Sequence, residues 1–298
     1  MSVEIILGFT LGLVSAVFFA FYMVPQKLVV IETPAYLWVM SVGVLLTTAI
    51  PWAASGFPLA HSWVEPGYGL LCGVGWMLGT LAFAAGIKRL GLALATPIKN
   101  TTGVLGTLVG LLIFQEWRTT NPWLCFAGSV LVVTAAIVIG QTGKAKVSQH
   151  ANIAGIIFAL LAALAYASYL VPMKMAMKNI GVYAFAPWMA IGMVIMATVI
   201  LLTQRGGVKL ILGYAPRVYF LSLLGGSCWA IAFLTMALSV SYVGLSIAWA
   251  LCNLNTVPAV FLGILAFHEI SFRQQWVKIT IGLLAAVAGT LLLGLSKG

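Results

Sequence analysis

The chain has 298 residues, of which 62% are hydrophobic and 7% are charged. Because a soluble domain is about 45–50% apolar and about 25% charged, this composition excludes a water-soluble globular protein. The net charge of +10 comes from Lys and Arg residues scattered through short segments between apolar runs, a pattern that suits a membrane surface and argues against a nucleic-acid partner.

Apolar runs long enough to cross a lipid bilayer recur along the whole chain. A helical crossing needs about 20 apolar residues, and helices satisfy all their backbone polar groups within hydrocarbon. We therefore predict an all-α membrane protein. The sequence predicts ten transmembrane helices, at residues 4–27, 34–54, 67–87, 92–114, 121–141, 152–175, 181–203, 216–240, 244–267 and 274–295.

The second half of the sequence repeats the first. The stretch FFAFYMVPQKL (18–28) is echoed by AYASYLVPMKM (165–175), which pairs Tyr22 with Tyr169 and Pro25 with Pro172 at an offset of 147 residues. Later pairs have an offset of 153 residues: Trp76 with Trp229, Gly91 with Gly244, Asn100 with Asn253, Glu116 with Glu269 and Trp123 with Trp276.

The repeat predicts two five-helix halves, residues 1–143 and 152–298, joined by a polar linker over 144–151. Because five is odd, the two halves should cross the membrane in opposite directions. Such an inverted repeat is typical of secondary transporters, which bind their substrate where the repeats meet. The sequence therefore predicts a transporter.

Other functional classes lack the residues that they need. The chain has no Asp, and none of its five Glu residues lies near the middle of a predicted helix. This disfavours an intramembrane enzyme, which needs a convergent acid–base or nucleophile set, and a proton-coupled exporter of cationic drugs. The sequence also shows no nucleotide-binding loop and no metal-ligand cluster, so we expect no cofactor and no metal.

The stretch ATPIKNTTG (95–103) places a lysine inside the fourth predicted helix. A lysine at a helix centre costs about 2.5–3.5 kcal/mol in a bilayer and usually faces a water-filled cavity. We therefore predict that Lys99 lines the solute path. The alternatives are that it reaches back to the interface beside Lys88 and Arg89, or bonds to carbonyls freed by Pro97.

Residues three and four apart share one face of a helix, so the neighbours of Lys99 can be placed. The face around it carries Thr96, Asn100 and Gly103, and the equivalent face of the second half carries Trp249, Cys252, Asn253 and Thr256. We expect the two faces to approach each other and to supply amide and aromatic groups to a small polar solute.

Aromatic residues within the predicted helices are further candidates. Trp76, Trp229, Tyr22 and Tyr169 either line a solute cavity or belong to the lipid-facing core. The predicted substrate-binding set is Lys99, Asn100, Thr96, Trp249, Asn253, Trp76, Trp229, Tyr22 and Tyr169.

Four residues are candidates for gating. Pro25 and Pro172 occupy matching positions and suggest paired hinges, with harmless kinks as the alternative. Glu116 and Glu269 each end a predicted helix, as exposed carboxylates or as members of gating ion pairs.

The duplicated ten-helix layout resembles that of the drug/metabolite transporter superfamily. Within it, FFAFYMVPQKL (18–28) and GLALATPIKNTTGVLGTLVGLLIFQEW (91–117) resemble the glucose/ribose/rhamnose porter branch. The resemblance implies a sugar carrier. We expect it to lie in the bacterial cytoplasmic (inner) membrane and to act as a monomer or homodimer. A carrier of amino acids or organic anions, with Lys99 binding a carboxylate or phosphate, is the alternative.

Overall fold

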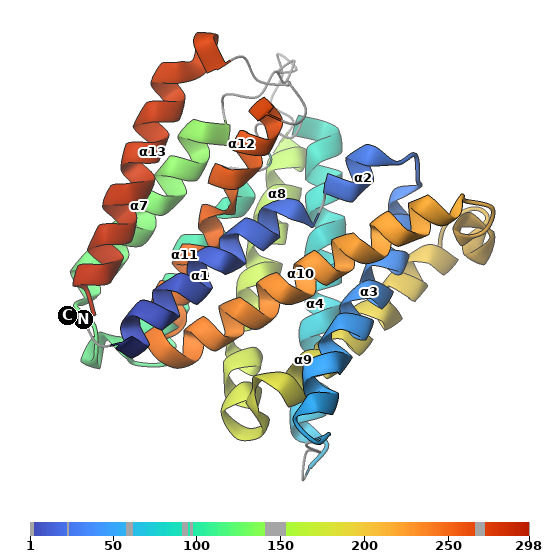
Figure 1. Cartoon of the computed structure of the whole chain (residues 1–298), viewed down its shortest axis with the longest axis horizontal. Helices are drawn as coiled ribbons and strands as arrows, with labels where there is room; N and C mark the ends of the chain where they lie inside the picture. The colour runs from blue at the N-terminus through green and yellow to red at the C-terminus, as the bar shows by residue number, and fades with distance from the viewer. Residues whose placement is uncertain are drawn as a thin grey trace. The chain divides into compact units, whose positions relative to one another are not determined.

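The computed structural model describes residues 3–22, 24–57, 62–90, 95, 98–140, 153–265 and 272–297, and all regular structure in these ranges is helical. The α-helices are α1 (Val3–Phe21), α2 (Val24–Leu28), α3 (Thr33–Ala54), α4 (Val64–Leu90), α6 (Thr102–Leu108), α7 (Pro122–Gly140), α8 (Ile153–Ser168), α9 (Leu170–Leu202), α10 (Pro216–Val243), α11 (Leu245–Cys252), α12 (Thr256–Leu265) and α13 (Phe272–Leu295) (Figure 1). The short turns are the π-helical η1 (Val109–Ile113) and the 3-10 turns η2 (Glu116–Arg118), η3 (Gly207–Ile211) and η4 (Asn253–Asn255).

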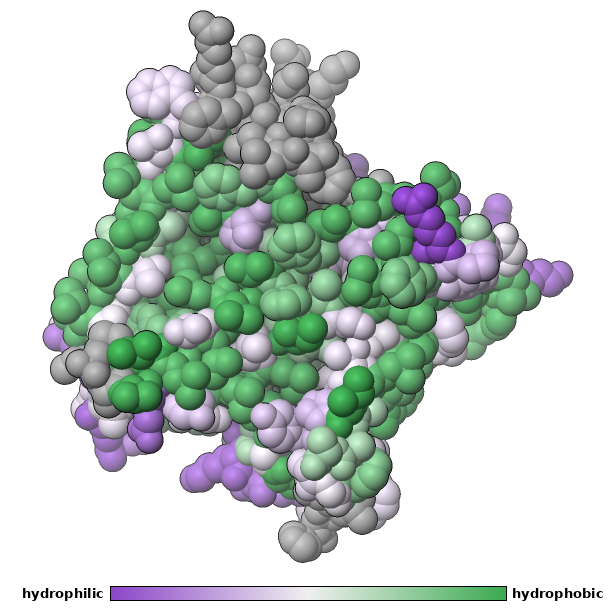
Figure 2. Space-filling model, viewed as in Figure 1, coloured by the Kyte–Doolittle hydropathy of each residue, from purple (hydrophilic) through white to green (hydrophobic). Residues whose placement is uncertain are grey.

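The described helices carry an apolar surface that requires a lipid environment. Seven helical stretches are long and apolar enough to cross a membrane, and residues 98–113 form a shorter apolar helix. Large side chains on these helices are exposed, among them Leu71, Leu284 and Leu291. Figure 2 shows a face covered mostly by hydrophobic residues. An apolar surface this extensive is not found on soluble monomers, so the predicted all-α integral membrane protein is confirmed.

Contacts divide the chain into two compact units, and each unit combines segments from both halves of the sequence. Unit 1 comprises residues 1–17, 79–168 and 235–298, and unit 2 comprises residues 18–78 and 169–234. In unit 1, α7 and α13 lie side by side (Figure 1). In the same unit, α6 packs on α11. In unit 2, α3 packs on α9.

Within unit 2, α3 and α10 approach each other so closely that only glycine fits at the contact. A Cβ atom on Gly43 of α3 would overlap the carbonyl of Leu223, and one on Gly226 of α10 would overlap the carbonyl of Met40. Such backbone contact is the usual role of small residues in membrane helices, where packing replaces the hydrophobic effect.

The contact between α4 and α9 repeats the same arrangement. A Cβ on Gly73 of α4 would overlap the carbonyl of Met189, and one on Gly192 of α9 would overlap that of Leu70. Leu70 and Gly73 precede Leu223 and Gly226 of α10 by 153 residues, the offset of the sequence repeat. The two contacts are therefore images of each other under that repeat.

Several helices that the sequence predicts as continuous are interrupted in the described residues. The sixth, predicted over 152–175, has a turn at Tyr169 between α8 and α9. The first, predicted over 4–27, ends at Phe21, and α2 begins at Val24. Pro25 has no N–H to donate to the carbonyl of Phe21, so the helical ladder cannot continue unbroken there. The ninth, predicted over 244–267, is divided into α11, η4 and α12, because Pro258 cannot donate to the carbonyl of Leu254.

We predict that Gly73→Ala destabilises the protein, because its methyl group would overlap the carbonyl of Met189. Overpacking of this kind costs about 1–3 kcal/mol. Gly75→Ala is the matched control on the same helix, since a Cβ at Gly75 meets nothing within 4 Å. Thermal unfolding of both variants in detergent measures the difference. Equal unfolding temperatures would contradict the close contact of α4 and α9.

Candidate functional site

The predicted site residues that the structure describes fall into two groups, one in each unit. Unit 1 holds Lys99, Asn100, Trp249, Asn253 and Glu116, and unit 2 holds Tyr22, Trp76, Trp229, Tyr169, Pro25 and Pro172. Thr96 and Glu269 lie outside the described residues.

The unit 2 group is built around a cluster of five rings, which we call the aromatic cluster: Phe19, Tyr22, Trp76, Trp229 and Phe233. The rings of Trp76 and Trp229 meet edge to face, with centroids 4.9 Å apart, and Trp229 stacks on Phe233 at 5.4 Å. Phe19 contacts Trp229 at 6.2 Å and Tyr22 contacts Trp76 at 6.5 Å. The end of α1, α4 and α10 thus hold together three of the predicted substrate-binding side chains.

Trp229 has a polar atom that the surrounding rings do not satisfy. Its side chain is only 1% exposed, and its Nε1–H has no hydrogen-bond partner among the described residues. A buried donor without a partner costs about 1–3 kcal/mol, and buried indole N–H groups usually have one. The aromatic cluster therefore offers an unused donor beside aromatic faces.

Both predicted hinge prolines follow an interruption of a helix in unit 2. Pro25 is the second residue of α2, and Pro172 lies in the first turn of α9, after the turn at Tyr169 that ends α8. Proline is tolerated in a first helical turn, where its missing N–H would have no partner in the helix. The two interruptions thus occupy matching places in the two halves of the sequence.

The carbonyl group at each interruption has a different donor. Tyr36 donates its hydroxyl to the carbonyl of Tyr22 at 2.5 Å, and a Cβ on Gly225 would lie 2.7 Å from that same oxygen. At the second interruption, the thiol of Cys72 donates to the carbonyl of Tyr169 at 3.5 Å. Cys72 is the repeat counterpart of Gly225, at an offset of 153 residues.

In unit 1, the two helix faces identified from the sequence contact each other. Asn100 donates from Nδ2 to the hydroxyl of Thr256 at 3.1 Å. The repeat relates Asn100 to Asn253 and Thr256 to Gly103. Asn253 and Gly103 are likewise neighbours, since a Cβ on Gly103 would lie 3.4 Å from the side-chain amide carbon of Asn253. Glycine offers no hydroxyl, so Asn253 instead donates to the carbonyl of Trp249 at 2.8 Å.

The polar atoms of these faces differ in whether they already have partners. Trp249 donates from Nε1 to the carbonyl of Thr102 at 2.9 Å and packs so tightly on Gly106 that a Cβ there would overlap the indole. Its role in the described residues is therefore to join α6 to α11. By contrast, Oδ1 of Asn100 is buried without a partner among them.

Lys99 lies against aromatic side chains of two other helices of unit 1. Its Nζ is 5.6 Å from the ring centroid of Phe83 on α4 and 6.0 Å from that of Tyr166 on α8. Tyr166 shares a hydrogen bond of 2.9 Å with the hydroxyl of Thr80. Aromatic faces attract an ammonium group, and this attraction strengthens where water is excluded.

Glu116 caps the N-terminus of α11. Its Oε1 accepts a hydrogen bond from the N–H of Leu245 at 2.7 Å, and its Oε2 accepts from the N–H of Ser246 at 2.9 Å and from the Ser246 hydroxyl. The carboxylate is buried, and the positive end of the helix dipole stabilises it there. From the sequence, Glu116 is predicted to be an exposed carboxylate at a helix end or part of a gating ion pair. The cap could not be predicted, because α11 is far from Glu116 along the chain.

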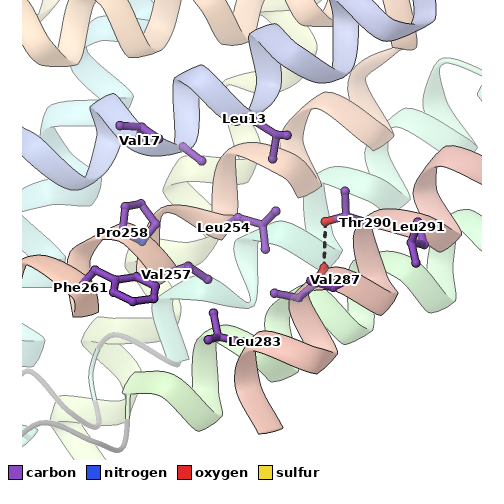
Figure 3. A pocket seen from close by; sticks show the side chains of 12 residues that line it. Leu13, Val17, Leu254, Val257, Pro258, Phe261, Leu283, Val287, Thr290 and Leu291 are labelled. Atoms are coloured by element: carbon purple, nitrogen blue, oxygen red, sulfur yellow. Dashed lines mark hydrogen bonds between the residues drawn. The ribbon is translucent and has the colours of Figure 1, made fainter. Parts of the chain in front are cut away.

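The pocket that the structure shows in unit 1 is unsuited to a polar solute. Its volume is about 490 Å³, and α1, α12 and α13 line it (Figure 3). The polar side chain among its lining residues is Thr290, whose hydroxyl donates to the carbonyl of Ala286 at 2.8 Å. Lining residues such as Leu291 are exposed on the apolar surface, so this pocket is suited to an apolar hydrocarbon chain and not to a polar solute.

The described helices thus form a membrane protein with aromatic and amide side chains buried inside it. The family model described as "Sugar transport protein" matches residues 59–296. Because this match covers most of the sequence, the chain belongs to the sugar transport protein family, whose members are transporters and not enzymes.

Curated relatives cover most of the chain at low identity. A protein of Listeria innocua named "Putative sugar uptake protein" is 27% identical over 234 residues, which cover 78% of this chain and 79% of the relative. A Bacillus cereus protein named "Probable glucose uptake protein GlcU" is 24% identical over 238 residues, with 78% and 79% covered. A crystal structure with 15% identity and a TM-score of 0.76 covers 96% of this chain and 95% of its own, which shows a shared fold.

We predict that Glu116→Gln destabilises the protein by about 2 kcal/mol, since hydrogen bonds to charged groups are worth about 1.5–3 kcal/mol. The variant keeps the shape of the side chain but replaces one accepting oxygen with an NH2 group. Glu32→Gln is the control, because Glu32 is exposed and its side chain makes no cap hydrogen bond. Denaturant titration in detergent micelles measures both. Equal stability of the two variants would show that the cap is unimportant.

Proposed function

We propose that the protein is an alternating-access carrier that takes up a monosaccharide across the bacterial cytoplasmic membrane. The observation that carries this proposal is the aromatic cluster, in which the buried Nε1–H of Trp229 has no partner among the described residues. Membership of the sugar transport protein family and the names of the bacterial relatives support the same substrate class and direction.

The carrier is proposed to be a ten-helix inverted repeat of two five-helix halves, residues 1–143 and 152–298. Two pairs of matching contacts and one pair of matching interruptions support this. The contact of α3 with α10 corresponds to that of α4 with α9 under the repeat. In the same way, the contact of Asn100 with Thr256 corresponds to the contact of Asn253 with Gly103. The interruptions at Tyr22 and Tyr169 also match. Contacts that recur in this way are expected when two copies of one ancestral unit pack together.

The aromatic cluster is proposed to bind the sugar ring. The C–H face of a sugar can lie on an indole ring, while its hydroxyls need hydrogen-bond partners. Trp76 and Trp229 supply ring faces, and Nε1 of Trp229 supplies a donor for one hydroxyl oxygen. A site that donates to a substrate hydroxyl discriminates against analogues lacking it, because its own donor then stays unsatisfied.

The interruptions before Pro25 and Pro172 are proposed to be the hinges of alternating access. At each interruption a side chain from another helix of unit 2 donates to a backbone carbonyl, Tyr36 to that of Tyr22 and Cys72 to that of Tyr169. The latter carbonyl also accepts from the N–H of Met173. Hinges are commonly a few residues at the ends of helices, where backbone dihedral angles can change without breaking a packed core.

We expect Trp229→Phe to raise KM for sugar uptake about two- to tenfold, the equivalent of one neutral hydrogen bond. The variant keeps an aromatic ring but loses the Nε1–H. Uptake of labelled glucose into proteoliposomes measures KM, and Trp123→Phe is the control, because Trp123 is 81% exposed. A series of monodeoxyglucoses sharpens the test: the analogue lacking the bonded hydroxyl should have the same KM in both proteins. An unchanged KM for every sugar would remove Trp229 from the site.

Replacing Pro25 with alanine should slow transport. Alanine supplies an N–H that can bond the carbonyl of Phe21 and close the gap between α1 and α2. We expect a severalfold lower maximal rate with little change in KM, measured by initial rates of glucose uptake. Pro51→Ala, within the last turn of α3, is the control. A maximal rate equal to that of the control would show that the interruption is not a hinge.

A further inference from the structure

The ammonium group of Lys99 lies deep within the apolar region of unit 1. Phe83 is seven residues from the end of α4 at Leu90, or about 10 Å at 1.5 Å per residue. Tyr166 is thirteen residues from the start of α8 at Ile153, or about 20 Å. Both rings contact the ammonium, so it lies beside apolar stretches of α4 and α8 and away from the basic end of α4 at Lys88 and Arg89.

This ammonium has no negative counter-charge among the described residues. It forms no hydrogen bond or ion pair with them, and the titratable side chains near it there include the thiol of Cys252 and the phenol of Tyr166. The described carboxylate nearest along the chain, that of Glu116, accepts hydrogen bonds from α11 instead. Ring faces compensate a positive charge only in part, so an unpaired ammonium at this depth favours a ligand that brings an anionic group.

A second unused group lies on the same turn of the chain. Oδ1 of Asn100, the next residue, is buried and has no partner among the described residues, while Nδ2 of the same side chain is held by Thr256. A donor cation and a fixed acceptor on adjacent residues suit a ligand with both an anionic group and hydroxyls. A simple inorganic anion would use the ammonium and leave the amide oxygen unsatisfied.

We propose that Lys99 binds the carboxylate or phosphate of an anionic monosaccharide, so that this carrier prefers sugar acids or sugar phosphates to neutral sugars. The inference rests on the proposed sugar transport, narrows its substrate class and adds a binding position in unit 1 that is separate from the aromatic cluster of unit 2. The ammonium donates to the anionic oxygens, and Oδ1 of Asn100 accepts from a sugar hydroxyl. The aromatic rings of Phe83 and Tyr166 hold the ammonium in place when no substrate is bound.

Competition for uptake of labelled glucose into proteoliposomes tests this preference. The competitors are unlabelled glucose, glucuronate and glucose 6-phosphate, with acetate and inorganic phosphate as controls for simple anions. In the wild type, we expect glucuronate or glucose 6-phosphate to inhibit at a concentration at least fivefold lower than glucose. Whichever of the two succeeds distinguishes a carboxylate from a phosphate as the preferred group.

The variants assign the preference to one residue. In Lys99→Gln the advantage of the anionic sugar over glucose should fall at least fivefold, whatever happens to the overall rate, and Lys99→Arg should retain it. Lys88→Gln, which removes an exposed positive charge at the end of α4, should also retain it. Loss of the advantage in Lys88→Gln as well would indicate a surface-charge effect and overturn the assignment.

Two further outcomes separate this inference from the proposed function. If labelled glucose is transported but neither anionic sugar inhibits better than glucose, the preference is wrong and sugar transport stands. If no sugar is transported or bound, both fail. Calorimetric titration of the detergent-purified wild type with glucuronate and with glucose decides the preference without any variant: weaker binding of glucuronate would overturn it.

Discussion

The structure is governed by the absence of water from the bilayer interior, which forces every polar group there to find its partner within the protein. Glu116 meets this constraint by receiving the first N–H groups of α11. The carbonyl of Tyr22, freed by the break in α1, receives the hydroxyl of Tyr36. Against this background, the few buried groups that the described residues leave unsatisfied become informative. In the part of the chain that the structure describes, these groups are Nε1 of Trp229, Oδ1 of Asn100 and the hydroxyl of Thr102.

Much of the fold could be predicted because hydrocarbon imposes a simple rule on the sequence. Helix length and apolar composition placed α3, α7 and α10 within a few residues of their observed ends. Where the prediction differed, as at Tyr22 and at Asn253–Asn255, a proline had removed one hydrogen bond from an otherwise uniform apolar run. The interleaving of the two halves into compact units could not be predicted, since it depends on contacts such as that of Gly43 with Leu223.

The candidate site was only partly predictable. The repeat and the helical periodicity identified the two faces that meet at Asn100 and Thr256, and they singled out Trp76 and Trp229. They could not reveal that the indole N–H of Trp249 donates to the carbonyl of Thr102, while that of Trp229 has no partner among the described residues. Hydrogen-bond saturation depends on side-chain direction and on remote backbone atoms, and neither is encoded in residue spacing.

The interleaving of the halves has a consequence for biosynthesis. When the ribosome has completed α4, Gly43 and Gly73 have nothing to pack against, because their contact residues Leu223 and Met189 are not yet translated. Unit 2 cannot close until residue 234 has emerged, and unit 1 needs segments from the far end of the chain. Early helices must therefore remain in the bilayer, or beside the insertion machinery, as loosely associated segments. Maturation is consequently a late event in which both units close after most of the polypeptide has entered the membrane.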